Sequence, residues 1–275
     1  MELSPTIVVA FELGLILSGL AMLWRFALSP AGRASAAAPA LPKWGISVVD
    51  FLLLLWSAIM GGILGQFLTL ALLKLAAGSA TDDTRQIVAT VGLQFGLLGG
   101  FLAGNSLLPG LRAVPAAPPR ARAARPLLAG GAVFLAAMPL VAAVSFVWEY
   151  LLDVLGLPVE KQELMDLFAN PGSPGLLATM ILLAIVVAPI TEELVFRAGL
   201  FRFARGRLPR WAALLAPAVL FGAVHGNLAS FAPLAVLGLV FSLAYERTGD
   251  IRVSMVAHGL FNLCTALLIF SGADV

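Results

Sequence analysis

An all-α, polytopic membrane bundle of about eight transmembrane helices is the fold that this sequence predicts, for three reasons. Hydrophobic residues form 60% of the 275-residue chain and charged residues only 12%, against about 25% charged in an average soluble domain. The apolar runs are long enough to cross a hydrocarbon core of about 30 Å. Lysine and arginine gather in every second joint between these runs, as expected for a chain that crosses a membrane repeatedly.

Run length places eight spans along the chain. The sixth and seventh are short and contain or adjoin a proline, so we expect them to tilt or bend. The spans are residues 5–28, 46–76, 86–108, 127–155, 174–200, 211–227, 231–245 and 253–271. We divide the chain into an N-terminal three-span region with basic linkers, residues 1–125, and a C-terminal core, residues 126–275.

The basic residues predict an orientation, because lysine and arginine are retained on the cytoplasmic side of a membrane. All but Lys74, Arg85 and Lys161 fall in or beside the first, third, fifth and seventh joints. Eight spans then place both termini outside the cytoplasm. The joint 156–173 differs, because its apolar residues share one helical face with charges opposite, which predicts a short helix on the outer membrane surface.

Three late spans carry polar side chains that lipid-facing helices do not tolerate. A charged or imidazole side chain in hydrocarbon costs several kcal/mol unless it faces a partner or a water pocket. The residues are Glu192, Glu193 and Arg197 in TEELVFR, His225 in LFGAVHGN, and His258 and Asn262 in VAHGLFNL. These segments hold both histidines of the chain and predict one shared polar site inside the membrane.

Helical spacing separates the roles of the two acidic residues. Glu193 and Arg197 are four residues apart and share a face, which suits an ion pair. Glu192 points about 100° away and has no basic residue three or four positions away. It therefore suits a general base that takes a proton from water. The alternative is an ordinary helix end, at which glutamate and arginine simply meet the membrane interface.

The two histidines each have a neighbour four residues away. His225 shares a face with Phe221, and by itself it would more often be structural. His258 shares a face with Asn262, and the two could donate hydrogen bonds to an oxyanion formed as a carbonyl carbon is attacked. Adhesion between helices is the alternative for Asn262.

A metal site is a second interpretation of the same residues. Glu192, His225 and His258 are the set that would hold zinc, leaving a position for water. The short HExxH motif is absent, so such a site would have to be assembled from three helices.

The three motifs EELVFR, FGAVH and HGLFN, in this order on late spans, resemble those of the CPBP (Abi) family of intramembrane proteases. This family includes the CAAX prenyl endopeptidases of the Rce1 type. The resemblance covers roughly residues 150–271 and implies that residues 126–275 form a protease core.

By this resemblance, the chain is an endopeptidase that cleaves a peptide bond inside or next to the bilayer. Glu192 and His225 would activate the attacking water, and His258 with Asn262 would stabilise the oxyanion. Supporting roles fall to Glu193, Arg197 and Phe221. The family is commonly labelled metalloprotease, but its best-understood branch is described as using glutamate and histidine alone. Because asparagine is a poor zinc ligand and a good amide donor, we expect the metal-free mechanism, with zinc as the alternative cofactor.

The expected partners are the lipid bilayer and a peptide or protein substrate at the membrane, with no nucleic acid. The expected location is a bacterial inner membrane, crossed several times. A prenylated substrate is not carried over from the family, because nothing in the sequence identifies a prenyl groove. Two other function classes stay open: a non-proteolytic immunity or scaffold protein of this family, and a proton-coupled transporter, since Glu12 and Glu149 lie in other spans.

The depths of the motif residues below the basic joints do not agree. Counted at the helical rise, Glu192 and His258 lie about 8–12 Å deep and His225 about 22 Å. We therefore expect a sixth helix that starts late, bends near Pro217 or tilts, and a site reached laterally or from the cytoplasmic half.

Overall fold

The computed structural model describes residues 4–35, 41–42, 44–112, 125–159 and 173–271. Within these ranges the chain is helical, with short connections and no strand. Seven helices of this described part are long and apolar enough to cross a membrane. The all-α membrane bundle is therefore confirmed. The surface helix predicted at 156–173 falls mainly on residues outside the described ranges and stays a prediction.

The seven long helices correspond to seven of the predicted spans. They are α1 (Pro5–Leu23) with its π-helical continuation Trp24–Leu28, α3 (Val48–Ala77), α4 (Asp82–Leu107), α6 (Pro126–Val154), the continuous helix Pro174–Arg205, α12 (Leu228–Thr248) and α13 (Ile251–Phe270). The sixth predicted span is α11 (Arg210–Ala223), a helix of only 14 residues, or about 21 Å. Two short helices, α2 (Pro30–Ser35) and α5 (Pro109–Arg112), follow α1 and α4.

Local sequence determines where several helices begin. The side chains that accept a hydrogen bond from a first-turn N–H group are Ser47 for α3, Thr81 for α4, Ser173 for α8 (Pro174–Leu182), Asn227 for α12 and Asp250 for α13. Such caps satisfy N–H groups that have no partner within the helix. The cap at Asn227 matters for the site, because it comes two residues after His225.

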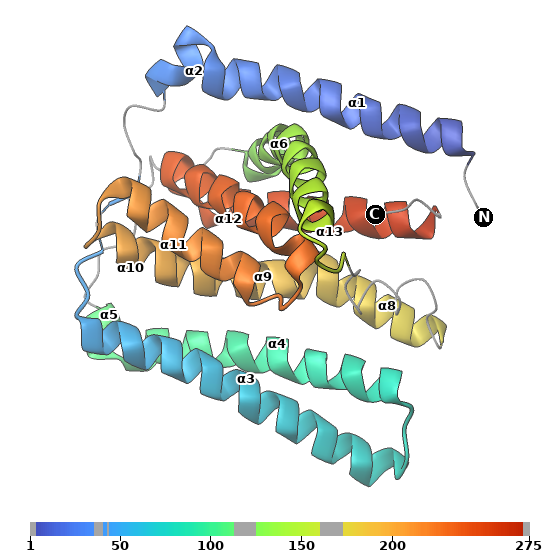
Figure 1. Cartoon of the computed structure of the whole chain (residues 1–275). Coiled ribbons are helices and arrows are strands. Elements are labelled where there is room, and N and C mark those ends of the chain that lie inside the picture. Colours follow the sequence, from blue (N-terminus) through green and yellow to red (C-terminus); the bar gives the residue numbers. More distant parts are fainter. Residues whose placement is uncertain (1–3, 36–40, 43, 113–124, 160–172, 272–275) are drawn as a thin grey trace.

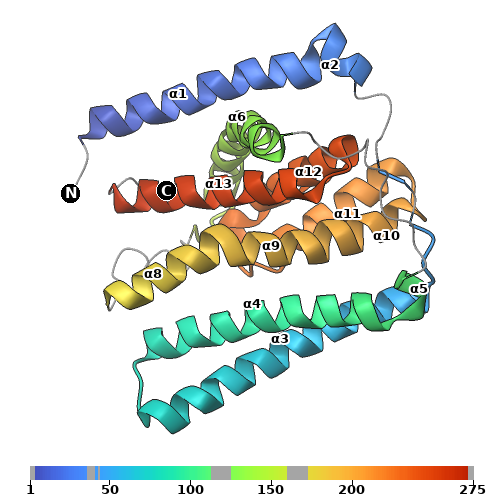
Figure 2. The same ribbon diagram turned by 180° about the vertical axis from the view of Figure 1, so that it is seen from behind.

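The helices form layers, with α1 on one side of the bundle and the α3–α4 hairpin on the other (Figures 1 and 2). Glycines allow close contact: a Cβ atom at Gly19 would lie 2.3 Å from the carbonyl oxygen of Leu135 on α6. In the hairpin, a Cβ atom at Gly96 would lie 2.2 Å from the carbonyl oxygen of Gly61. Small residues commonly mediate helix packing in membranes. The helices of the C-terminal half lie between α1 and the hairpin.

The helices α2, α5 and α10 (Arg202–Arg205), which carry described basic residues of the joints, lie at the same end of the bundle (Figure 1). The carboxylate of Glu246 is buried there, 2.6 Å from Arg205 Nε and 2.7 Å from Arg210 Nη2. Arg247 Nη1 donates to the carbonyl oxygen of Phe26 at 3.2 Å. The start of α1 and the end of α13 lie at the other end (Figure 1). Which end faces the cytoplasm stays a prediction.

Candidate functional site

One long helix, Pro174–Arg205, carries the acidic residues of the site. Two π-helical stretches, Leu183–Val187 and Leu194–Phe201, flank its short segment α9 (Ala188–Glu193). Such stretches widen one turn by a residue and are frequent at functional sites. Pro189, which has no N–H group to donate, comes two residues after the end of the first stretch. The π-helical turns therefore determine the direction in which the glutamates of α9 point.

Arg197 lies inside the protein, which corrects its predicted place at the cytoplasmic end of a span that stops at residue 200. The helix continues to Arg205, and the Arg197 side chain is only 1% exposed. Its Nη1 lies 2.9 Å from Glu193 Oε1, so the predicted ion pair is present. An arginine is costly in hydrocarbon unless it is paired. For this reason the sequence alone suggested that Arg197 lies at the membrane surface.

Groups on α11 and α12 complete the surroundings of Arg197. Its Nη2 donates to the carbonyl oxygen of Gly238 at 3.2 Å. Its Cζ lies 4.4 Å from the ring centroid of Phe221 and 5.3 Å from that of Phe241, within the range of cation–π attraction. The guanidinium thus connects the helix of Glu193 to both neighbouring helices.

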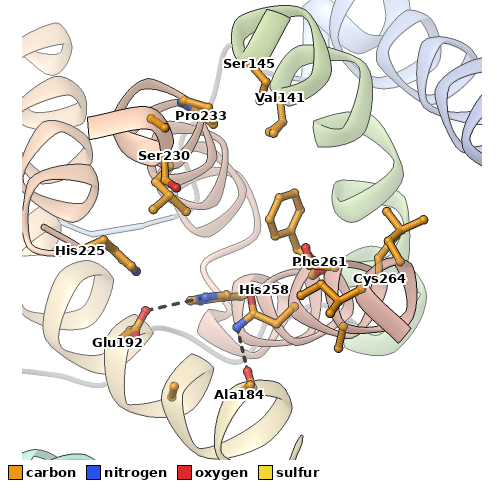
Figure 3. A pocket seen from close by; sticks show the side chains of 18 of the residues that line it. Val141, Ser145, Ala184, Glu192, His225, Ser230, Pro233, His258, Phe261 and Cys264 are labelled. Carbon is orange, nitrogen blue, oxygen red and sulfur yellow. Dashed lines mark hydrogen bonds and ion pairs between the residues drawn. The ribbon is translucent and has the colours of Figure 1, made fainter. Parts of the chain in front are cut away.

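His258 on α13 lies between the two glutamates. Its Nδ1 donates to Glu193 Oε1 at 3.2 Å, and its Nε2 lies 3.7 Å from Glu192 Oε2 (Figure 3). The imidazole is stacked on Phe241 with centroids 5.1 Å apart and meets the edge of Phe221 at 5.7 Å. Residues from three separate segments of the chain therefore hold one ring in place.

His225 lies in the tight turn between α11 and α12. The turn passes through Gly226 at φ +66°, a conformation that favours glycine. His225 Nδ1 is 2.7 Å from the carbonyl oxygen of Phe221. A carbonyl only accepts, so Nδ1 carries the hydrogen, and in the neutral ring Nε2 keeps its lone pair. The ring points toward Glu192 (Figure 3).

The expected mismatch in depth between Glu192 and His225 disappears in the structure. Glu192 is 13 residues before Arg205, and His225 is 15 residues after Arg210, so both lie about 20 Å from the basic end. Neither a late start nor a bend of α11 is needed, because the helix of Glu192 is longer than predicted and α11 is short.

Asn262 binds the helix of the glutamates directly. Its Nδ2 donates to the carbonyl oxygen of Ala184 at 2.7 Å, inside the first π-helical stretch (Figure 3). In a π-helix this carbonyl would bond to the N–H five residues later, and that residue is Pro189. Gly259 allows the close approach, since a Cβ atom there would lie 2.6 Å from the carbonyl oxygen of Ile185. A second hydrogen of the Asn262 amide remains for another acceptor.

A cavity of about 710 Å³ joins these residues. Its polar lining includes Glu192, His225, His258 and Asn262, and most of the rest is apolar (Figure 3). The Glu192 side chain is 20% exposed, and its Oε2, which is itself buried and faces His258 Nε2 at 3.7 Å, has no hydrogen-bond partner. The cavity therefore exposes Glu192 to a ligand, whereas Glu193 is completely buried behind it.

The cavity lies in the half of the bundle away from the basic joints. Most of the lining residues on α6 and α13 lie in the last half of these helices, and those on α4 and α12 lie in the first half. The helix Pro174–Arg205 and His225 also contribute to the lining. The cavity is therefore not in the half that carries the basic joints, from which access was expected besides lateral entry. On that side, Arg197 and the rings around it fill the space.

The donor atoms do not converge as a metal site requires. Among the described residues, no group of three or more His, Cys, Asp or Glu side chains is placed to hold a metal ion. The set Glu192, His225 and His258 therefore does not have the arrangement of a zinc site, for which three protein ligands are needed.

Several residues around the site were missed in the sequence. Gln94 and Ser145 line the cavity, while Gly238 and Phe241 contact Arg197 from α12. Gln94 alone had a usable signal, because a lone amide in an apolar helix such as VGLQFGLLG requires a partner. The others are ordinary residues of membrane helices, and only their long-range contacts bring them to the site.

Comparisons with known proteins match the part of the chain that carries these residues. Residues 174–264, which include all three motifs, match the model of the Type II CAAX prenyl endopeptidase Rce1-like family. An uncharacterized 24.3 kDa protein of Escherichia coli is 32% identical over 122 residues, which are 42% of this chain and 55% of that protein. The Bacillus subtilis protein named "Putative membrane peptidase YdiL" is 32% identical over 89 residues, 32% of this chain and 36% of that protein.

The matched regions are only part of each protein. The chain spans about half of the Escherichia coli relative and about a third of the Bacillus relative. No solved structure matches the chain.

Proposed function

Because the C-terminal region of this chain, residues 174–264, belongs to the Rce1-like family, we propose that the protein is an intramembrane endopeptidase that hydrolyses a peptide bond by glutamate–histidine chemistry. One observation carries the proposal. Glu192, His225 and His258, from three segments of the chain, meet at one cavity, and Glu192 Oε2 is left without a hydrogen-bond partner.

In the proposed reaction, a water molecule lies between Glu192 and Nε2 of His225. The water oxygen forms a bond to the carbonyl carbon of the peptide as its proton moves to Glu192, which acts as general base. His225 orients the water by accepting its second hydrogen bond. Breaking the carbon–nitrogen bond then requires a proton on the leaving nitrogen, and protonated Glu192 supplies it.

The negative charge that develops on the substrate oxygen needs donors already in place. Asn262 has an amide hydrogen beyond the one given to Ala184, and His258, protonated on both ring nitrogens, donates from Nε2. The carboxylates of Glu192 and Glu193 on either side of His258 complement that positive form. The Glu193–Arg197 pair takes no part in proton transfer and keeps the ring in position.

The test is cleavage of an internally quenched apolar peptide by the full-length protein in liposomes. We expect Glu192→Gln to lower kcat by about 10²–10⁴-fold, and His225→Ala to lower it similarly. Glu12→Gln is the matched control, since this carboxylate lies in α1 and does not line the cavity. Unchanged cleavage by Glu192→Gln would contradict the proposal and favour a non-proteolytic binding role.

A chelator tests the metal question independently. Because the described donors are not arranged as a three-ligand site, we expect cleavage to survive excess 1,10-phenanthroline. Loss of activity that zinc restores would contradict the metal-free mechanism while leaving the peptidase function intact.

A further inference from the structure

The cavity lining carries two carboxylates and, among the described residues, no lysine or arginine. Glu149 on α6 and Glu192 on α9 line it together with the two histidines, and no lysine or arginine of the described ranges does. The buried guanidinium of Arg197 is held by Glu193 and is 1% exposed. At the Glu149 end, away from His258, an anionic group of a ligand would thus meet a like charge, whereas a cationic group would be attracted.

Glu149 is placed to receive such a group. It lies four residues after Ser145 and eight after Val141, on one face of α6, and both of these side chains point into the cavity (Figure 3). Trp148 Nε1 donates to the carbonyl oxygen of Leu228 at 2.8 Å, which fixes this part of α6 against the start of α12. Glu149 itself has no hydrogen bond or ion pair within the described part of the chain.

The rest of the lining suits the stem of a long side chain. Between Glu149 and the catalytic end, the cavity is bordered mainly by apolar groups, among them Met138, Val141, Leu183, Leu234 and Phe261. Lysine and arginine lay their methylene stems along such surfaces and place the charged group at a polar end. Glu149 is five residues before the end of α6, so that polar end is near the membrane surface.

We propose that the cavity takes an apolar peptide segment carrying a lysine or arginine whose charged group pairs with Glu149. The inference rests on the peptidase function proposed above and adds the class of substrate. The scissile bond lies at Glu192 and His225, and the cationic side chain extends toward the membrane surface away from the basic joints. A segment that must bring a free carboxylate into the cavity is disfavoured by the same charges.

The test uses one apolar, internally quenched peptide in versions that differ only at one position, which is lysine, norleucine or glutamate. A series of such peptides places the varied residue at successive positions of the peptide. The full-length protein in liposomes should cleave the best lysine peptide with about tenfold higher kcat/KM than its glutamate version. Glu149→Gln should remove that preference, and Glu149→Lys should reverse it.

Asp153→Asn is the matched control, because Asp153 is an exposed acid on the same helix that does not line the cavity. It should leave the lysine preference unchanged. Equal cleavage of the three versions at every position, or a preference that survives Glu149→Gln, overturns the inference without affecting the peptidase function.

Binding separates the two proposals. Fluorescence anisotropy of the same peptides with Glu192→Gln protein measures the preference without cleavage. Tighter binding of the lysine peptide that is lost in Glu149→Gln/Glu192→Gln supports the inference even if no peptide is cleaved, in which case the peptidase function alone fails. Equal binding of lysine and glutamate peptides overturns the inference.

Discussion

The Glu193–Arg197 pair shows what residue spacing can and cannot predict. A separation of four in a helix makes the two side chains neighbours, and the ion pair was predicted on that basis alone. The depth of the pair was wrong, because the carbonyl of Gly238 and the ring of Phe221, which make Arg197 tolerable, belong to other helices. Both residues are far from Arg197 in the chain, so helical periodicity does not reveal these contacts.

At this scale we expect Arg197→Met to destabilise the protein strongly. It would remove the arginine that pairs with the carboxylate of Glu193, which is 0% exposed, and breaking a buried pair costs about 3–5 kcal/mol. Thermal unfolding in detergent measures the effect. The double variant Glu193→Gln/Arg197→Met removes both charges and should recover much of the loss.

Arg85→Met is the control for this prediction, since Arg85 pairs with Asp82 at the exposed α3–α4 turn. Exposed pairs of this kind contribute little, so its unfolding temperature should not change. A wild-type unfolding temperature for Arg197→Met would show that the buried pair is not needed.

Among the elements, hydropathy located seven long helices to within a few residues. It overestimated the length of the sixth predicted span, which is α11. Apolar run length shows where a helix can cross hydrocarbon, but it is insensitive to whether a turn is α-helical or π-helical. The stretches Leu183–Val187 and Leu194–Phe201 were therefore not predicted. The neighbourhood of Pro189 was a partial signal, because a proline inside a helix leaves a carbonyl without its donor.

The bond from Asn262 to Ala184 should depend on Pro189. Asn262→Leu removes the donor, and hydrogen bonds between membrane helices contribute about 0.6 kcal/mol on average and at most about 1.7. In a Pro189→Ala background the new N–H supplies a competing donor, so the same substitution should cost less. Unfolding of the four proteins in a double-mutant cycle measures the coupling.

Thr265→Val is the control for this cycle, because Thr265 bonds only to Phe261 of its own helix. It should show no coupling to Pro189→Ala. A cost of Asn262→Leu that is the same in both backgrounds would contradict the link between the proline and the asparagine.

For the whole molecule, the sequence predicted the gathering of the basic joints at one end, since the charges alternate with the spans. It did not predict the half of the bundle in which the cavity lies. That property depends on the full length of the helix Pro174–Arg205 and on the shortness of α11, both of which were misjudged by a few residues. Small errors in helix ends thus changed the predicted side of access.

The orientation can be measured with single cysteines in a Cys264→Ser background. The positive-inside rule places the basic end in the cytoplasm. On intact cells, a membrane-impermeant maleimide should then label Ser79→Cys, at the exposed α3–α4 turn, and not Ala34→Cys, in the exposed α2. Both should react after lysis. The reverse pattern would invert the topology and place the cavity toward the cytoplasm.

The direction in which Glu192, the proposed catalytic glutamate, points depends on the number of residues in the π-helical stretch before Pro189. Each residue of a helix turns the chain by about 100°, so losing a single residue from Leu183–Val187 would rotate everything that follows by that angle relative to α8. Glu192 would then leave the cavity although no chemical group of the site had been altered. The protein should accept conservative exchanges in that stretch far more readily than a deletion of one codon.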